Sequence, residues 1–215
     1  MPAIVSFIGW HDSGKTTLAS RVVAEVKRLG YNVAVIKSSS EKGIVFDSPG
    51  TDTYKHTKAG ADGIMLVAPD QMIVRTGNKG LDLATLANRF FPEVDLVVGE
   101  GFKTADSIAK IEVFKDSDMR IREQVDGVVA IAASHRVVSH LPVFSLDDAR
   151  EIAQFILDRF FEGKKTTTCV VLVNDRPISL VGKDSEKITR LVADFISERA
   201  GGDTIESIDI HIDLK

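Results

Sequence analysis

Short hydrophobic runs recur along most of the chain, and several are continuous rather than alternating with polar residues. A strand that is covered on both faces shows such a run, because neither face is left to water. Segments with helical spacing of hydrophobic residues separate the runs. Strands that alternate with helices predict an α/β fold, with a mostly parallel sheet and helices on both faces. The predicted strands are residues 3–8, 33–36, 63–67, 72–74, 94–98, 108–114 and 128–133.

The segment over residues 15–29 illustrates the helical pattern. Its hydrophobic side chains recur at a spacing that places them on one face of a helix. These side chains are Leu18, Val22, Val26 and Leu29. Gly30 follows, and glycine is common just past the C-terminal end of a helix. We predict further helices over residues 52–59, 82–91 and 147–161.

The composition changes at the segment EGKKTTT, residues 162–168, which contains no hydrophobic residue. Beyond it the pattern predicts a hairpin that turns at residues 174–177, a helix with hydrophobic residues from Ile188 to Ile196, and a last strand over IDIHID. Such a β-β-α-β piece is small, so we expect it to dock on the main domain or on a second copy. The predicted division is a main domain over 1–162, a linker over 163–168 and a C-terminal segment over 169–215.

Composition and charge argue against several classes of function. The chain of 215 residues has a net charge of -4, and its 27 basic residues are scattered among 31 acidic ones, which argues against a nucleic-acid partner. No stretch approaches the roughly 18 hydrophobic residues of a membrane-spanning helix, and the N-terminus lacks a leader pattern, so we expect a cytoplasmic protein without a membrane partner. Cys169 is the only cysteine and the histidines lack metal-ligand spacing, so we expect neither an internal disulfide nor a zinc site.

The segment GWHDSGKTT, residues 9–17, lies between the first predicted strand and the first predicted helix. It has the pattern G-x-x-x-x-G-K-T of a phosphate-binding loop, in which glycines let backbone N–H groups face a phosphate and the helix dipole adds positive potential. Lys15 is expected to reach the terminal phosphates and Thr16 to ligate Mg²⁺, while the Asp12 carboxylate points outward. The predicted nucleotide-binding residues of this P-loop are Gly9, Asp12, Ser13, Gly14, Lys15, Thr16 and Thr17.

The strand over residues 94–98 brings a second candidate to the same site. Ligands of open α/β sheets bind at the carboxyl ends of the strands, so a residue after a strand is a better candidate than one at its start. This rule favours Glu100 over Asp95. Glu100 is predicted to hold magnesium, directly or through water, or to orient an attacking water as the catalytic residue. A solvated turn acid is the alternative reading, and Lys103 adds a candidate positive charge.

Polar residues also follow the second predicted strand, at the same edge of the sheet. This strand ends at Lys37 and Ser38, and the loop after it contains Asp47 and Asp52 before a short helix. We include Lys37 and Asp52 in the predicted nucleotide site. Asp52 has an equally good reading as the N-cap of the short helix, because aspartate is favoured at that position.

Three segments taken together, GWHDSGKTT, DSPGTDTYKHTKAGAD and DLVVGEGFKTADSIAKIEVFKD, resemble the molybdopterin-guanine dinucleotide biosynthesis protein B (MobB) family over roughly residues 1–160. The resemblance implies a P-loop protein that binds GTP and Mg²⁺, is commonly a homodimer and is a weak GTPase. It also implies a partner, the guanylyltransferase that joins GMP to molybdopterin. Carried over by motif, the P-loop binds the nucleotide, and Asp52, Glu100 and Lys103 belong to the site.

The chain departs from the family pattern after its second strand, where it has Ser38, Ser39 and Ser40 in place of frequent histidines. The C-terminal segment lies outside the resemblance, and we read it as a stabilising cap rather than a docking surface. The sequence also contains no clear motif that identifies the base of the nucleotide. The nearest match to a guanine-reading N-K-x-D is NKGLD, residues 78–82, which has Leu81 where the aspartate belongs, and we read it as a turn. The loop AASH, residues 132–135, is a candidate for backbone contacts with a base, and GTP is implied by the resemblance alone.

Two other functions fit parts of the sequence. A P-loop kinase that phosphorylates a small metabolite would need an acid or base and a substrate pocket, for which Asp47, Asp52 and Glu100 are candidates. A structural subunit with a vestigial loop is disfavoured, because Lys15 and Thr16 are both present. The leading interpretation is a nucleotide-binding accessory protein that is at most a slow GTPase.

Overall fold

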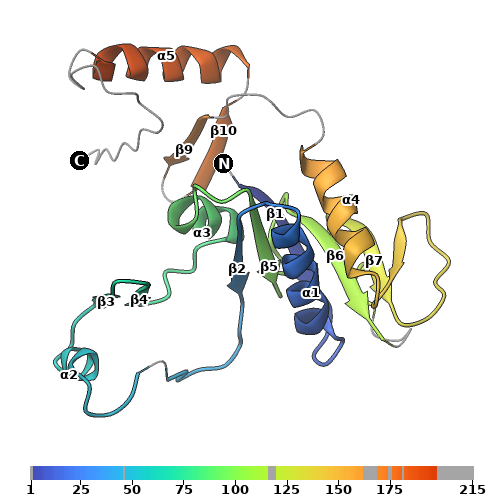
Figure 1. The fold of residues 1–215 in the computed structure, drawn as a ribbon, viewed down its shortest axis with the longest axis horizontal. Coiled ribbons are helices and arrows are strands. Elements are labelled where there is room, and N and C mark those ends of the chain that lie inside the picture. The colour runs from blue at the N-terminus through green and yellow to red at the C-terminus, as the bar shows by residue number, and fades with distance from the viewer. Residues whose placement is uncertain are drawn as a thin grey trace.

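The computed structural model describes residues 2–45, 47–115, 120–161, 169–173, 176–180 and 182–197. Its centre is a six-stranded sheet in the order β2-β5-β1-β6-β7-β8, in which every neighbouring pair is parallel (Figure 1). The predicted α/β class is therefore confirmed. The strands are β1 (Ala3–Ile8), β2 (Val33–Lys37), β5 (Leu96–Glu100), β6 (Ala109–Phe114), β7 (Val128–Ala133) and β8 (Val143–Ser145).

Helices cover both faces of this sheet, as the pattern predicts. Helices α1 (Lys15–Arg28) and α4 (Ala149–Phe161) pack against one face, and α3 (Leu83–Phe90) packs against the other (Figure 1). The buried side chains of α1 recur at helical spacing, and Gly30 follows with a φ of 94°, which glycine adopts without strain. The main core lies between α1, α4 and the sheet. It buries Val5, Phe7, Leu18, Val22, Val98, Val113 and Ile152.

Two charged residues of β6 are buried and partnered. The Lys110 ammonium donates to the carbonyl oxygens of Ala105 and Asp126, at 2.6 and 2.7 Å. The fully buried Glu112 carboxylate accepts from the backbone N–H of Arg122 and pairs with its guanidinium at 2.9 Å. Because buried charges are costly unless they are paired, these contacts fix the neighbouring loops to the sheet.

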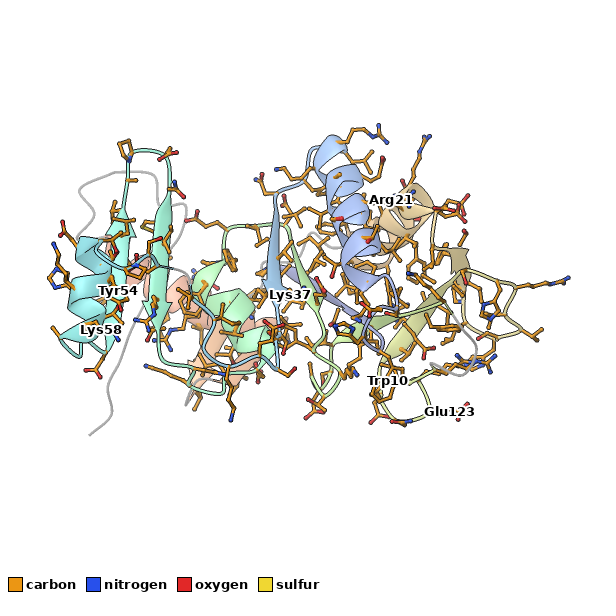
Figure 2. The ribbon with its side chains drawn as sticks, turned by 90° about the horizontal axis from the view of Figure 1, so that it is seen from below. Trp10, Arg21, Lys37, Tyr54, Lys58 and Glu123 are labelled. Carbon is orange, nitrogen blue, oxygen red and sulfur yellow. The ribbon has the colours of Figure 1, made fainter. Side chains whose placement is uncertain are left out.

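The predicted strands at residues 63–67 and 72–74 do not join the main sheet. They form a separate antiparallel hairpin, β3 (Gly63–Val67) and β4 (Met72–Thr76), which lies with α2 (Asp52–Lys58) away from the main sheet (Figures 1 and 2). The connection between them is a short turn, closed by a hydrogen bond from Ala68 N to Gln71 O, and so short a connection allows only antiparallel pairing. Their continuous hydrophobic runs are largely exposed within this chain rather than buried in a sheet.

The C-terminal segment contains the predicted hairpin and helix. Strands β9 (Cys169–Val173) and β10 (Arg176–Leu180) pair antiparallel, α5 (Lys183–Ser197) follows, and β10 contacts α3. The predicted linker over 163–168 and the predicted last strand over IDIHID lie outside the described residues. No helix in the described part of the chain is long and apolar enough to cross a membrane.

Candidate nucleotide-binding site

The P-loop connects the end of β1 to the start of α1. Gly9 passes so close to β6 that a Cβ at this position would lie 2.2 Å from the carbonyl oxygen of Val113. Gly14 caps α1 in the left-handed region, with a φ of 92°. Glycine is therefore required at both ends of the loop, the first for space and the second for conformation. The Asp12 side chain is 87% exposed and lies 2.8 Å from His11 Nδ1, so it points outward as predicted.

The parallel register brings two more polar residues, Glu100 and Lys37, to this loop. Glu100 ends β5 and is aligned with Phe7 of β1 and Lys37 of β2. The Glu100 carboxylate accepts a short hydrogen bond from the hydroxyl of Thr16, and the Lys37 ammonium lies 3.2 Å from the same oxygen. The side chain of Glu100 is only 9% exposed. Asp95 lies at the opposite end of the strand, where its carboxylate accepts from Asn32 N, so only Glu100 reaches the P-loop.

The side chain of Lys15 folds back onto the P-loop. Its ammonium donates to the carbonyl oxygen of Trp10 at 2.5 Å and to Ser13 Oγ at 3.3 Å. Burial lowers the pKa of Lys15, the nearby Glu100 carboxylate opposes this shift, and Lys103 and Lys37 add to it. Burial and the two neighbouring lysines thus disfavour the charged form of Lys15, which a bound polyphosphate would favour.

Lys103 also rests on Trp10, through a different contact. Its ammonium lies 4.0 Å from the centroid of the indole ring, which is a cation–π distance. Sequence reasoning selected Lys103 but missed Trp10, because an aromatic residue inside a phosphate loop has no expected role. Lys15, Lys37 and Lys103 thus surround the P-loop from α1, β2 and the segment after β5.

Thr16 and Glu100 are the described residues best placed to hold magnesium. Their oxygen atoms meet beside the N-terminus of α1, and Mg²⁺ prefers a few protein oxygens together with phosphate oxygens and water. In the described part of the chain no group of three or more histidine, cysteine, aspartate or glutamate residues is arranged to hold a metal ion. This arrangement suits a metal that arrives with the nucleotide.

Asp52 does not reach the P-loop. It lies in the first turn of α2, its side chain is 88% exposed, and its carboxylate pairs with Lys55 at 2.8 Å. Figure 2 shows Tyr54 and Lys58 of α2 beyond the hairpin, far from Trp10 and Lys37. Nor is Asp52 the N-cap of α2, because Thr51 accepts the hydrogen bond from Tyr54 N.

Asp47 lies beside the same helix. Its carboxylate accepts hydrogen bonds from Thr51 Oγ1 and Ser48 N, and the bond from Thr51 is the main cause of its lowered pKa. Of the three acids that are candidates for a kinase, Asp47 and Asp52 thus belong to the α2 region within this chain, and only Glu100 lies at the P-loop.

The other side of the P-loop meets segments that follow β6 and β8. A Cβ on Gly14 would lie 3.4 Å from Lys115 Cε and 4.0 Å from Leu146 Cδ1. The carbonyl oxygen of Lys115 lies 2.6 Å from Ser134 Oγ and 2.9 Å from His135 Nδ1. The predicted segment AASH therefore lies close to this side of the site. The segment after β8 escaped sequence reasoning, because the strand has only three residues.

Comparisons with known proteins agree with this geometry. A family profile described as molybdopterin guanine dinucleotide synthesis protein B (MobB) matches residues 4–134. The chain is 28% identical over 165 residues to the molybdopterin-guanine dinucleotide biosynthesis adapter protein of Escherichia coli, covering 74% of this chain and 93% of that protein. It is 35% identical over 120 residues to a putative adapter protein of the same description from Methanocaldococcus jannaschii, covering 54% of this chain and 48% of that protein.

Solved structures give the same result. The crystal structure of Bacillus subtilis MobB superposes with a TM-score of 0.61 at 26% identity, covering 75% of this chain and 99% of that one. The family profile spans more than half of the chain, including the P-loop and Glu100, and the described fold agrees with it. This protein therefore belongs to the MobB family.

Proposed function

We propose that this protein is a cytoplasmic adapter in the synthesis of molybdopterin guanine dinucleotide, which binds GTP with Mg²⁺ and assists the guanylyltransferase that attaches GMP to molybdopterin. The observation that carries the proposal is that Lys15, Thr16 and Glu100 lie together at one P-loop in a chain of the MobB family. The names of the E. coli and M. jannaschii relatives support the pathway.

The geometry supports phosphate binding by exchange of partners. A polyphosphate entering the loop replaces the Trp10 carbonyl as the partner of the Lys15 ammonium, and the N-terminus of α1 adds backbone N–H donors. Lys103 is free to leave the Trp10 ring for a phosphate, because an exposed cation–π contact is worth only about 0.5–1 kcal/mol. Both exchanges bring positive charge to the terminal phosphates.

Magnesium would bind between the nucleotide and the β5 side of the loop. Thr16 supplies a hydroxyl oxygen and Glu100 a carboxylate oxygen, the latter directly or through water. Bound there, the ion would neutralise charge that develops on phosphate oxygens. Glu100 is already engaged by Thr16 and Lys37, so it is poorly placed to accept a proton from water, which supports slow hydrolysis.

A titration of the purified protein with MgGTP and with MgATP tests this proposal. We expect micromolar binding with a preference for GTP, slow turnover in isolation, and loss of binding in Lys15→Ala with the fold retained, because the Lys15 ammonium contacts only loop atoms among its described hydrogen bonds. Arg28→Ala is the matched control, since Arg28 ends α1 away from the loop. Unchanged GTP affinity in Lys15→Ala, or rapid GTP turnover without a partner, would contradict the proposal.

The exposed hairpin supports the homodimer. Six hydrophobic side chains of β3 and β4 are each between 47% and 68% exposed. They are Met65, Leu66, Val67, Met72, Ile73 and Val74. An isolated two-stranded sheet is marginally stable in water, and contiguous exposed apolar side chains mark interaction sites. A second copy that covers this hairpin would stabilise the two-stranded sheet and bury its exposed apolar side chains.

A further inference from the structure

We infer that the carboxylate of Asp147 reads the guanine base of the bound nucleotide, an inference that rests on the proposed function because it requires a nucleotide in the P-loop. Asp147 follows β8, in the segment that leads into α4. Guanine recognition would then come from the loop after β8 and not from an N-K-x-D sequence.

The direction in which the nucleotide runs follows from the magnesium ligands. Thr16 donates to Glu100, which also pairs with Lys37, on the side of β1 where β5 and β2 lie. A magnesium ion held by Thr16 and Glu100 would draw the terminal phosphates of the nucleotide toward that side. The ribose and the base therefore extend from the loop toward the opposite side, where β6, β7 and β8 end.

The segment after β8 borders the P-loop helix on that side. Leu146 lies next to Gly14, as the 4.0 Å approach to its Cδ1 shows. Further along α1, the guanidinium of Arg21 donates to the carbonyl oxygens of Leu146 and Asp147 and to Asp147 Oδ1, at 3.2, 2.7 and 3.2 Å. Arg21 thus positions Asp147 beside the expected path of the nucleoside.

Asp147 is an exposed carboxylate near this path, while other acids close to it are engaged or lie elsewhere. Asp148 directly precedes α4 and its carboxylate accepts from Ser145 N at 3.1 Å, and Glu112 is buried with Arg122. Glu123 lies across the sheet from Arg21, as Figure 2 shows. The Asp147 side chain is 89% exposed, and its described side-chain contact is through Oδ1 with Arg21.

A carboxylate distinguishes guanine from adenine by its hydrogen-bonding edge. Guanine presents two donors side by side, N1–H and the 2-amino group, and a carboxylate accepts from both. Adenine presents an acceptor at N1 and no amino group at C2, so the same carboxylate would meet a lone pair. Charge-assisted hydrogen bonds are stronger than neutral ones, so the discrimination is substantial.

The test is the variant Asp147→Asn, titrated with the Mg²⁺ complexes of GTP, XTP and ATP. The carboxamide oxygen still accepts from Arg21, so the loop stays in place, while the amide NH₂ now faces the base. Xanthine has a carbonyl at C2 in place of the amino group and accepts from that NH₂. We expect roughly ten- to hundredfold weaker GTP binding and a gain in XTP binding. Asp158→Asn is the matched control, because Asp158 is an exposed acid of α4 that pairs with Gln154.

The outcomes separate this inference from the proposed function. Reversal of the GTP and XTP preference in Asp147→Asn, with Asp158→Asn behaving as wild type, supports the inference. If Asp147→Asn keeps the GTP preference, or loses affinity for all three nucleotides equally, the inference is overturned. The proposed binding of GTP by the P-loop of the wild-type protein is not affected by either result. A wild-type protein that binds none of the three nucleotides overturns both.

Discussion

Lys15 makes nucleotide binding sensitive to alkaline pH. Burial lowers the pKa of its ammonium in the free protein, and a bound polyphosphate restores the charged form, so binding takes up a proton once the pH exceeds the lowered pKa. Affinity for MgGTP is therefore expected to be constant at pH values below that pKa. Above that pKa the affinity should fall by up to tenfold per pH unit. The fall should begin at a lower pH than it would for a lysine with an unperturbed pKa. Calorimetric titration from neutral to alkaline pH measures this dependence.

Lys15→Arg is the control for this dependence, because a guanidinium stays protonated throughout the range. A wild-type profile no steeper than that of Lys15→Arg would show that Lys15 does not control the pH dependence.

At the level of residues, the sequence predicts some features of the site and not others. The P-loop motif located Lys15, Thr16 and Gly14 directly, whereas the resting contacts of Lys15 and Lys103 with Trp10 depend on loop geometry that has no sequence pattern.

At the level of elements, prediction succeeded where hydrophobic periodicity reflects burial on the main sheet. Strands β1, β5, β6 and β7 and helix α1 are all recognisable in this way. Strand β8 is too short to show a pattern, so the loop with Asp147 was missed. The hydrophobic runs of β3 and β4 predict two strands but not their separate hairpin, because continuous runs indicate burial without indicating what covers them. The order of the chain and the resemblance both predict Asp52 in the site, while its position depends on where α2 and this hairpin lie.

Helix α3 illustrates how a single cap supports a packed element. The Asp82 carboxylate accepts from Thr85 N at 2.7 Å, at the start of a helix that buries Leu83 and Ala87. We expect Asp82→Ala to lower the free energy of unfolding by about 1 kcal/mol, measured by urea denaturation. Thr51→Ala removes the corresponding cap of α2, a helix that buries none of its residues within the chain. This variant should therefore lower the free energy of unfolding by less than Asp82→Ala does. Equal effects of the two variants would contradict this account.

For the whole molecule, the two faces of the hairpin differ in how they are covered. Arg75 of β4 reaches Thr57 of α2 at 2.8 Å, so α2 lies over the face that carries Arg75. The opposite face carries the cross-strand pairs Met65–Val74 and Val67–Met72, which are exposed in the single chain. We expect the second copy to cover this open face, because burying these four side chains removes the largest exposed apolar cluster on the hairpin.

The double variant Met65→Glu with Val74→Glu tests this interface. It places two like charges on one cross-strand pair, so they would repel each other and resist burial against a second copy. Light scattering after size exclusion is expected to give the mass of two chains for the wild type and of one chain for the double variant, with MgGTP binding retained, since the P-loop lies apart from the hairpin (Figure 2). Gln71→Glu adds a charge at the exposed turn of the same hairpin and should stay dimeric. A double variant that remains a dimer would place the contact between copies elsewhere on the molecule.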